Sequence, residues 1–391
     1  MIDTEALIKV YRGWDRLEKP KSMSIIDFDL ITPIEGEQFN SREEVLERLV
    51  QLHSQIKPTN EQEEFIEAKV NAGIYFLRAL RGEEIPYGEY VEAITGVRPQ
   101  MIPEQDVQRQ VSIMHNRMRD TGYDSKKGSF EQFALDLRVS KEDAQKEVGD
   151  CEETLLPIVL RALGLKDLEP AYRVSFEVED DYWRGWTSTS DGQLLLRYNF
   201  HPNIIWYKGD SETTTLHEVG GHFVQAANLR KGIAEGRIDP FIGLTTVQEP
   251  HTFAGEGTAD ALLYFLPEVE DVLSPHGSLS RDQRAARDYL YNNAQIMVNE
   301  GGSLNEAVRY VVENHPFSAE KTVHDDLVRC ITNPARRAYF YIYGISRYKH
   351  EEFRQRLNPQ QQIEYLRHAM STYHTPKNLF AFVDGLAQQQ R

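Results

Sequence analysis

The chain has 391 residues, of which 40% are hydrophobic and 27% are charged, so its composition is that of a globular protein with a large core. Its formal net charge of −17 argues against a nucleic-acid ligand and against binding to anionic membrane surfaces. No stretch approaches the roughly 20 apolar residues that span a bilayer. We therefore expect neither nucleic acid nor a membrane among its partners.

The start of the chain and its cysteines bear on location. Residues Met1 to Glu5 include neither a basic segment nor an apolar one, as a signal peptide would. Two cysteines, Cys151 and Cys330, are too few for a disulfide framework, and we expect them to be buried thiols. These features predict a cytoplasmic protein.

The N-terminal part of the chain has the pattern of successive amphipathic helices. Ser41 and Glu44 have the spacing of a capping box, and the apolar residues that follow recur with a helical period. Three further helices are expected at about 61–81, 103–120 and 140–163, each followed by a glycine. The sequence therefore predicts a helical lobe in this region.

The pattern changes between residues 171 and 201. Residues 172–178 alternate, residues 193–200 are rich in leucine and aromatic side chains, and Asp191-Gly192 provides a turn between them. These features predict a small hairpin or sheet.

Helical texture returns after this β element and continues almost to the end. The chain is thus predicted to be mainly α-helical, with two helical lobes that flank a cleft and the β element as one wall. We place an N-terminal helical lobe at 1–165 and a second lobe at 166–391. The second lobe comprises the β element (171–201), the helices that bear the motif described next (211–265) and a helical C-terminal part (279–389).

The most informative segment runs from His217 to His222 and reads HEVGGH. Histidine is the commonest zinc ligand, and hydrolytic zinc sites keep a glutamate, here Glu218, beside the first ligand. On a regular helix, two histidines five residues apart are rotated by about 140° and cannot share a metal. One extra residue in a π-type bulge restores the common face. Because glycine tolerates unusual dihedral angles, we expect that bulge at Gly220 and Gly221.

A third ligand is expected downstream, because a catalytic zinc binds three protein ligands and leaves one position for water. Glu256 is the candidate, and Asp260 lies one helical turn beyond it, so that both share a face if the segment is helical. Asp260 would then accept the N–H of a ligating histidine and fix its tautomer. The alternative for Asp260 is a helix cap or a salt bridge with an arginine.

These residues resemble those of the gluzincin zinc metallopeptidases, in which HExxH is followed by a glutamate ligand on a helix. The one-residue expansion is similar to the HExxGH motif of the dipeptidyl peptidase III family, which it matches letter for letter. The segment from His222 to Gln225, with Glu256-Gly257, is also similar to a bacterial metallopeptidase family that carries HExxPGHHxQ and EGWA. The proline, the second histidine and the tryptophan of that pattern are missing here. The specific resemblance covers only about residues 216–263.

The resemblance implies a role for each matching residue. His217, His222 and Glu256 would bind one Zn²⁺ per chain, and Asp260 would support a ligand from behind. Glu218 would act as the general base, which takes a proton from the attacking water and passes it to the leaving amine.

The resemblance also points to residues 333–344 as the source of a donor for the oxyanion that forms in such reactions. The bacterial family carries a P…YxxG helix that is similar to this segment. Tyr341 is the first choice for the donor and Tyr343 the second, with core packing as the alternative for both. Arg336 and Arg337 are candidates for binding a substrate carboxylate, with ordinary salt bridges as the alternative.

We interpret the chain as a zinc-dependent hydrolase of peptide or other amide bonds. His251, five residues before Glu256, is a further candidate for substrate contact, although a loop histidine without a function is the alternative. Two other functions stay open: a zinc enzyme that acts on an amide, ester or C–N bond of a small metabolite, and a non-catalytic zinc-binding module. The intact Glu218 argues against the second, because a structural site needs no base. The sequence does not specify the oligomeric state.

Overall fold

A computed structural model describes residues 2–21, 23–31, 33–124, 126, 128–168, 172–179, 184–190 and 193–389. Helices make up most of this part of the chain, as the sequence predicts. The α-helices in chain order are α1 (Thr4–Glu18), α2 (Arg42–His53), α3 (Glu61–Leu80), α4 (Tyr87–Thr95), α5 (Glu104–Asp120), α6 (Phe130–Asp136), α7 (Lys141–Thr154), α8 (Leu156–Leu163), α9 (Asp210–Thr215), α10 (Val224–Ala234), α11 (His251–Phe265), α12 (Pro267–Val272), α13 (Pro275–Asn299), α14 (Leu304–Asn314), α15 (Glu320–Thr332), α16 (Pro334–Arg356), α17 (Pro359–Ala369) and α18 (Pro376–Gln388).

The strands form two small sheets. In the first, β1 and β5 pair antiparallel; in the second, β4 lies between β2 and β3, parallel to β2 and antiparallel to β3. The shorter elements and strands are η1 (Lys19–Lys21), β1 (Ile26–Asp29), β2 (Tyr172–Glu177), β3 (Gly185–Ser190), β4 (Gln193–Asn199), η2 (Leu216–Phe223), η3 (Pro240–Gly243) and β5 (Leu244–Thr246).

The sheet corrects part of the sequence prediction. The two predicted strands exist as β2 and β4, but they are parallel and do not form a hairpin with each other. The antiparallel partner of β4 is β3, whose polar sequence WTSTS after Gly185 lacks the apolar alternation by which strands are recognised. The predicted turn at Asp191-Gly192 lies outside the described residues.

The helix predictions hold except for one break and for two short strands, β1 and β5, which lie in regions predicted to be helical. The predicted helix at 140–163 is two helices, α7 and α8, which meet at Leu155. Pro157 lies in the first turn of α8, where its missing N–H costs nothing but where it ends the preceding helix. Ser41 caps α2 by accepting from the backbone N–H of Glu44 at 3.3 Å, but the predicted capping box is incomplete, because Glu44 accepts from the backbone N–H of Asn40 at 2.8 Å and not from that of Ser41.

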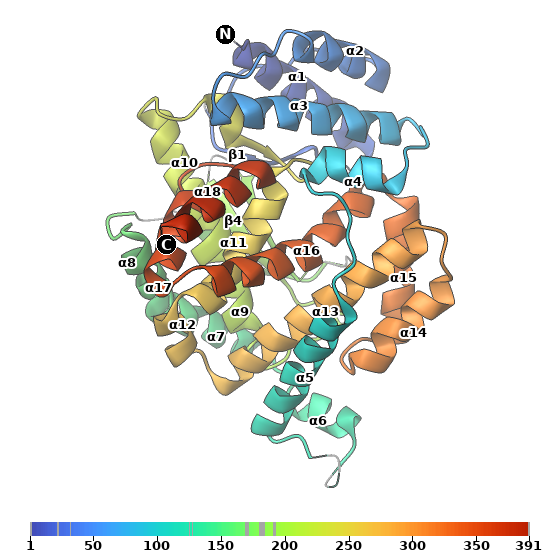
Figure 1. The fold of residues 1–391 in the computed structure, drawn as a ribbon, viewed down its shortest axis with the longest axis vertical. Helices are drawn as coiled ribbons and strands as arrows, with labels where there is room; N and C mark the ends of the chain where they lie inside the picture. Colours follow the sequence, from blue (N-terminus) through green and yellow to red (C-terminus); the bar gives the residue numbers. More distant parts are fainter. Residues whose placement is uncertain are drawn as a thin grey trace.

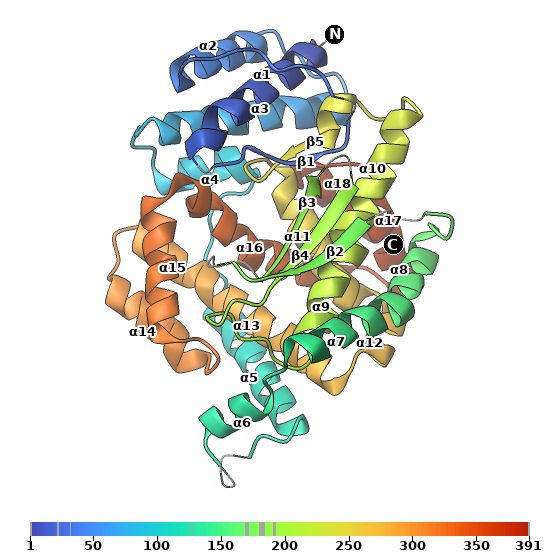
Figure 2. The same cartoon turned by 180° about the vertical axis from the view of Figure 1, so that it is seen from behind.

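The helices are arranged in layers around the sheet of β2, β3 and β4. The layer of α1, α2 and α3 lies at one end of the molecule, and α5 and α6 lie at the other (Figure 1, Figure 2). Between them, α11 packs against η2 and α16, while α13 packs against α5 and α16. Helix η2 also contacts β3 and β4, so the HEVGGH segment lies between the sheet and α11.

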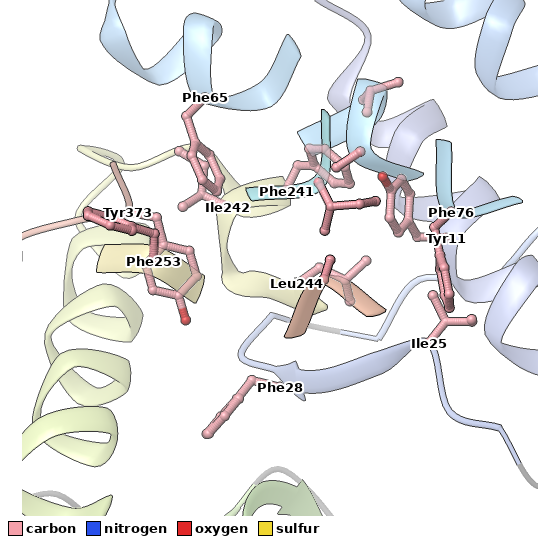
Figure 3. Packing of buried hydrophobic residues seen from close by; sticks show 14 of the residues in the cluster. Tyr11, Ile25, Phe28, Phe65, Phe76, Phe241, Ile242, Leu244, Phe253 and Tyr373 are labelled. Carbon is pink, nitrogen blue, oxygen red and sulfur yellow. The ribbon is translucent and has the colours of Figure 1, made fainter. Parts of the chain in front are cut away.

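The buried apolar side chains form three clusters, and each cluster draws on both sides of residue 165. The first cluster joins the N-terminal helices to the segment around β5. Tyr11 of α1 packs edge-on against Phe241, with ring centroids 5.2 Å apart, and Leu244 lies close by (Figure 3). Elements from the two predicted lobes are therefore packed together through shared cores.

Two smaller expectations concern cysteines and membrane segments. Cys151 and Cys330 are free and buried, as predicted. Among the described residues, no helix is both long enough and apolar enough to cross a bilayer.

Candidate metal centre and its cavity

The HEVGGH segment forms a π-helical stretch, η2, within a longer helix that begins with α9 and ends with α10. This confirms the bulge predicted from the spacing of the two histidines. Because a π-helix bonds i to i+5, residues five apart come onto one face. The Nε2 atoms of His217 and His222 are 3.2 Å apart, and their ring centroids are 4.9 Å apart.

The two glycines of this segment serve packing. Neither Gly220 nor Gly221 has a positive φ, so the expected need for unusual dihedral angles is not what places them here. A Cβ at Gly221 would overlap the Cβ of Ala259 and lie 2.9 Å from its Cα. The absent side chain of Gly221 thus allows η2 to approach α11 closely, which brings the histidines to the carboxylates of that helix.

Helix α11 supplies Glu256 and Asp260 from one face, as predicted. Glu256 Oε2 lies 3.2 Å from His217 Nε2 and 3.8 Å from His222 Nε2. Asp260 Oδ1 lies 2.9 Å from the other ring nitrogen of His217, Nδ1. The second oxygen of Asp260 forms a salt bridge of 2.6 Å with Arg347, which also contacts Asp288 at 3.2 Å.

The group formed by His217, His222 and Glu256 fits a metal ion. One ligand atom from each residue lies within 4.8 Å of the others. Glu256 Oε2 is buried and has no hydrogen-bond donor in good geometry among the described residues, and its polar neighbours are the two histidine nitrogens that would share the metal with it. Asp260 holds Nδ1 of His217, which leaves Nε2 to bind a metal. Two nitrogens and one carboxylate oxygen are a ligand set that suits Zn²⁺.

The charges of this group are strongly coupled. Burial disfavours the charged form of His217, but Asp260 and Glu256 outweigh it and raise its pKa to about 10. Burial also opposes ionisation of Glu256, yet His217 and His222 lower its pKa to about 2. For Asp260, Arg347 and His217 overcome burial and hold the pKa well below its usual range. The carboxylates are therefore charged at neutral pH, as metal ligands must be.

A cavity of about 1670 Å³ opens beside the metal group. His217, Glu218, His222 and Glu256 all line it. Glu218 is half-buried and lies outside the set of three ligands. Its Oε1 is 3.6 Å from the position that a Cβ on Gly185 of β3 would take. The carboxylate of Glu218 is thus at the wall of the cavity, next to the β sheet.

The tyrosines of α16 are divided between the cavity and the core. Tyr339 and Tyr343 line the cavity, and their hydroxyls are 2.6 Å apart. The hydroxyl of Tyr339 donates to Glu256 Oε1 at 3.3 Å. Tyr341, the first choice from the sequence, is fully buried; its hydroxyl accepts from the backbone N–H of Gln100 at 3.0 Å. This corrects the expectation for Tyr341, because residues two apart on a helix point in nearly opposite directions.

The predicted substrate-binding residues also separate. Arg336 lines the cavity, with its guanidinium 5.2 Å from the ring centroid of Phe340. Arg337 does not line it: its guanidinium bonds to the carbonyl of Ile85 at 2.9 Å and to the side chain of Asn299 at 3.2 Å. The expectation that Arg337 binds substrate is therefore corrected; its contacts are within the chain, but they go to uncharged oxygens and not to the carboxylate of a salt bridge.

His251 lines the cavity but is committed to other contacts. Its Nε2 lies 3.1 Å from the side-chain oxygen of Gln225, and its ring stacks on Tyr373 at 3.5 Å between centroids. Burial, with the nearby charge of His374, holds its pKa well below the usual range. His251 is thus a neutral wall residue.

Sequence reasoning missed an acidic residue of the cavity, Asp27 on β1. Its Oδ1 accepts from the indole N–H of Trp186 at 3.2 Å. Burial raises its pKa to about 7, and the charges of Glu218 and Glu256 add to that rise. Asp27 precedes the motif by about 190 residues, and its only local signal is an acidic side chain within the strand IDFD.

Comparison with known proteins shows a shared fold. No family model matches the chain, and no curated protein matches it. The crystal structure described as that of "the putative lipoprotein from Colwellia psychrerythraea" is similar, with a TM-score of 0.55 and 17% sequence identity. The alignment covers 89% of this chain but only 59% of that protein, so this chain spans about three fifths of its length. At this identity the likeness concerns the fold alone.

Proposed function

We propose that the protein is a zinc-dependent hydrolase of peptide or related amide bonds. The observation that carries the proposal is the buried group of His217, His222 and Glu256, with Glu218 beside it at the wall of a large cavity. A structural zinc site is closed by four protein ligands, whereas this group offers three and faces a cavity.

Each residue has a role in the proposed reaction. A zinc ion bound by the three ligands supplies Lewis acidity. Glu218 takes the proton of the attacking water and delivers it to the nitrogen of the leaving group. The hydroxyl of Tyr343 is the proposed donor to the oxyanion, which requires the proton of Tyr339 to turn from Glu256 to Tyr343. Asp260 keeps the tautomer and orientation of His217 fixed.

The neighbouring sheet favours a peptide as the substrate. Strand β3 is an edge strand of its sheet, and residues Gly185 to Thr189 line the cavity. An edge strand has backbone donors and acceptors that can pair with an extended peptide. Glu218 lies beside Gly185, at the start of this edge. Strand β1 lies beside β3, and the backbone N–H of Asp29 donates to the hydroxyl of Thr189 at 2.8 Å. A peptide that pairs with the Gly185 end of β3 would therefore pass the proposed base.

The test measures metal and turnover separately. We expect about one zinc per chain by mass spectrometry of the reconstituted wild type, and its loss in His222→Ala. We expect Glu218→Gln to keep the zinc but to lose hydrolysis of a mixed peptide library by roughly 10²- to 10⁴-fold, because it lacks a base. A wild type without zinc after reconstitution, or a Glu218→Gln variant with full turnover, would contradict the proposal.

A further inference from the structure

The charged side chains of the cavity differ in whether they have partners. Most of its arginines lie against a carboxylate of the same chain, as Arg12 does with Asp29 at 2.8 Å and Arg329 with Asp326 at 3.2 Å. Such a pair offsets the charge of the guanidinium and uses at least one of its donors. An arginine with a carboxylate partner therefore binds a ligand less readily.

Arg284 of α13 is different. It is half-buried and lines the cavity, but no carboxylate among the described residues lies within 4.0 Å of its guanidinium. Its one hydrogen bond goes to the hydroxyl of Thr214 and is long, at 3.5 Å. A guanidinium has five N–H donors, so most of those on Arg284 have no partner among the described residues. Arg16 also lines the cavity and has no carboxylate partner among the described residues, but its side chain is exposed.

The position of Arg284 relates it to the proposed reaction. Thr214, which it contacts, precedes His217 by three residues in the same continuous helix. The methyl group of Thr214 and the Oε1 of Glu218 both border the same point, where a Cβ on Gly185 would lie, at 2.9 and 3.6 Å. Arg284 thus extends the wall of the cavity from Glu218 towards α13.

We propose that Arg284 binds a free carboxylate of the substrate, so that the enzyme cleaves an amide bond close to the C-terminus of a peptide. This inference rests on the proposed function and specifies its substrate. A guanidinium matches a carboxylate in a bidentate geometry, which a neutral amide cannot reproduce. The substrate class is therefore short or C-terminal peptide segments with an unmodified carboxylate.

A purely electrostatic role makes a different prediction. If Arg284 only balances the acidic side chains around it, its loss changes the binding of charged and neutral ligands through the whole site. If it binds a carboxylate, its loss removes the preference for that group alone. Paired ligands distinguish the two.

The probes are two zinc-binding hydroxamates: the monohydroxamate of 2-benzylsuccinic acid, and the same compound with its carboxylate replaced by a carboxamide. Calorimetry on the zinc-loaded protein measures the dissociation constant of each. For the wild type we expect the carboxylate ligand to bind about 10- to 100-fold more tightly than the amide. In Arg284→Met the ratio falls to near one, while binding of the amide changes by less than about threefold. Arg284→Lys, which keeps the charge and loses the planar fork, gives a ratio between the two.

Arg329→Met is the matched control, because Arg329 lines the same cavity but is paired with Asp326. We expect it to keep the wild-type ratio. A ratio near one in the wild type, or an unchanged ratio in both Arg284 variants, would overturn the inference and leave the proposed function intact. If zinc-loaded wild type binds neither hydroxamate, the proposed function itself fails, and the inference with it.

Discussion

Two buried histidine sites in this protein look alike in exposure and differ in how their ring nitrogens are used. His315, after α14, has Nδ1 2.8 Å from the hydroxyl of Ser318 and Nε2 3.0 Å from the carbonyl of Gln283. His217 has Nδ1 on Asp260, and its Nε2 faces the Nε2 of His222 and the Oε2 of Glu256. Burial alone therefore does not mark a metal ligand; a nitrogen that converges with other potential ligand atoms does.

The electrostatics of the two sites run in opposite directions. Burial, together with the charge of Arg287, lowers the pKa of His315 to about 3, so this residue is neutral in the folded protein. The carboxylates around His217 raise its pKa to about 10 against the effect of burial. In the metal-free chain His217 thus binds a proton where a metal cation would fit, whereas His315 stays unprotonated. A metal at the first site would displace that proton.

The largest expected effect is a loss of unfolding free energy at acid pH that depends on His315. Its pKa is about 6.5 when unfolded and about 3 when folded, so the unfolded chain binds more protons between these values. The contribution of neutral His315 to the unfolding free energy is therefore fully present above pH 6.5 and is lost as the pH falls towards 3. Between pH 7 and pH 4 we expect wild type to lose about 3 kcal/mol more unfolding free energy than His315→Gln.

Urea unfolding at both pH values, with a chelator present throughout, measures this difference. The chelator removes any contribution from metal release at acid pH. The same loss in wild type and in His315→Gln would mean that His315 is protonated in the folded state, and the contrast between the two sites would fail.

A second prediction addresses the partner of His217. Asp260→Asn weakens the hydrogen bond that orients the ligand, and we expect zinc affinity to fall about 10- to 100-fold. Competition with a chromogenic chelator measures it. Ser318→Ala removes the corresponding partner of His315 and serves as the control, for which we expect unchanged zinc affinity. Equal affinity in Asp260→Asn and wild type would show that the carboxylate does not support the ligand.

The sequence allowed most of the metal group to be predicted, because its residues lie in two short segments with a fixed helical geometry. The sequence did not predict which face of α16 lines the cavity. Tyr341 and Tyr343 are two positions apart, and only packing decides which of them faces the cavity. The pairing of Tyr339 with Tyr343, one helical turn apart, was the available signal.

Cavity residues that come from elements distant in sequence could not be predicted from the sequence. Asp27 and Arg284 reach the cavity from β1 and α13, and no local pattern connects either of them to the motif. Strand β3 was missed because its polar side chains line a cavity, so that apolar alternation is absent. In the fold, helices were predicted from periodicity, but the parallel pairing of β2 with β4 depends on tertiary contacts.

The smallest predicted effect tests why the two glycines of the motif are there. Gly221→Ala introduces a methyl group against the backbone of Ala259, which cannot move without shifting α11, and we expect a loss of at least about 1 kcal/mol of unfolding free energy. At Gly220 the nearest atom is the end of the flexible Leu216 side chain, at 3.1 Å, so Gly220→Ala should cost less. Because α11 carries Glu256, Gly221→Ala should also weaken zinc binding, whereas neither variant should change the titration of His315. If instead the two alanine variants behave alike, the close approach of η2 to α11 does not set the geometry of the metal group, and conformational freedom of the glycine pair becomes the better explanation.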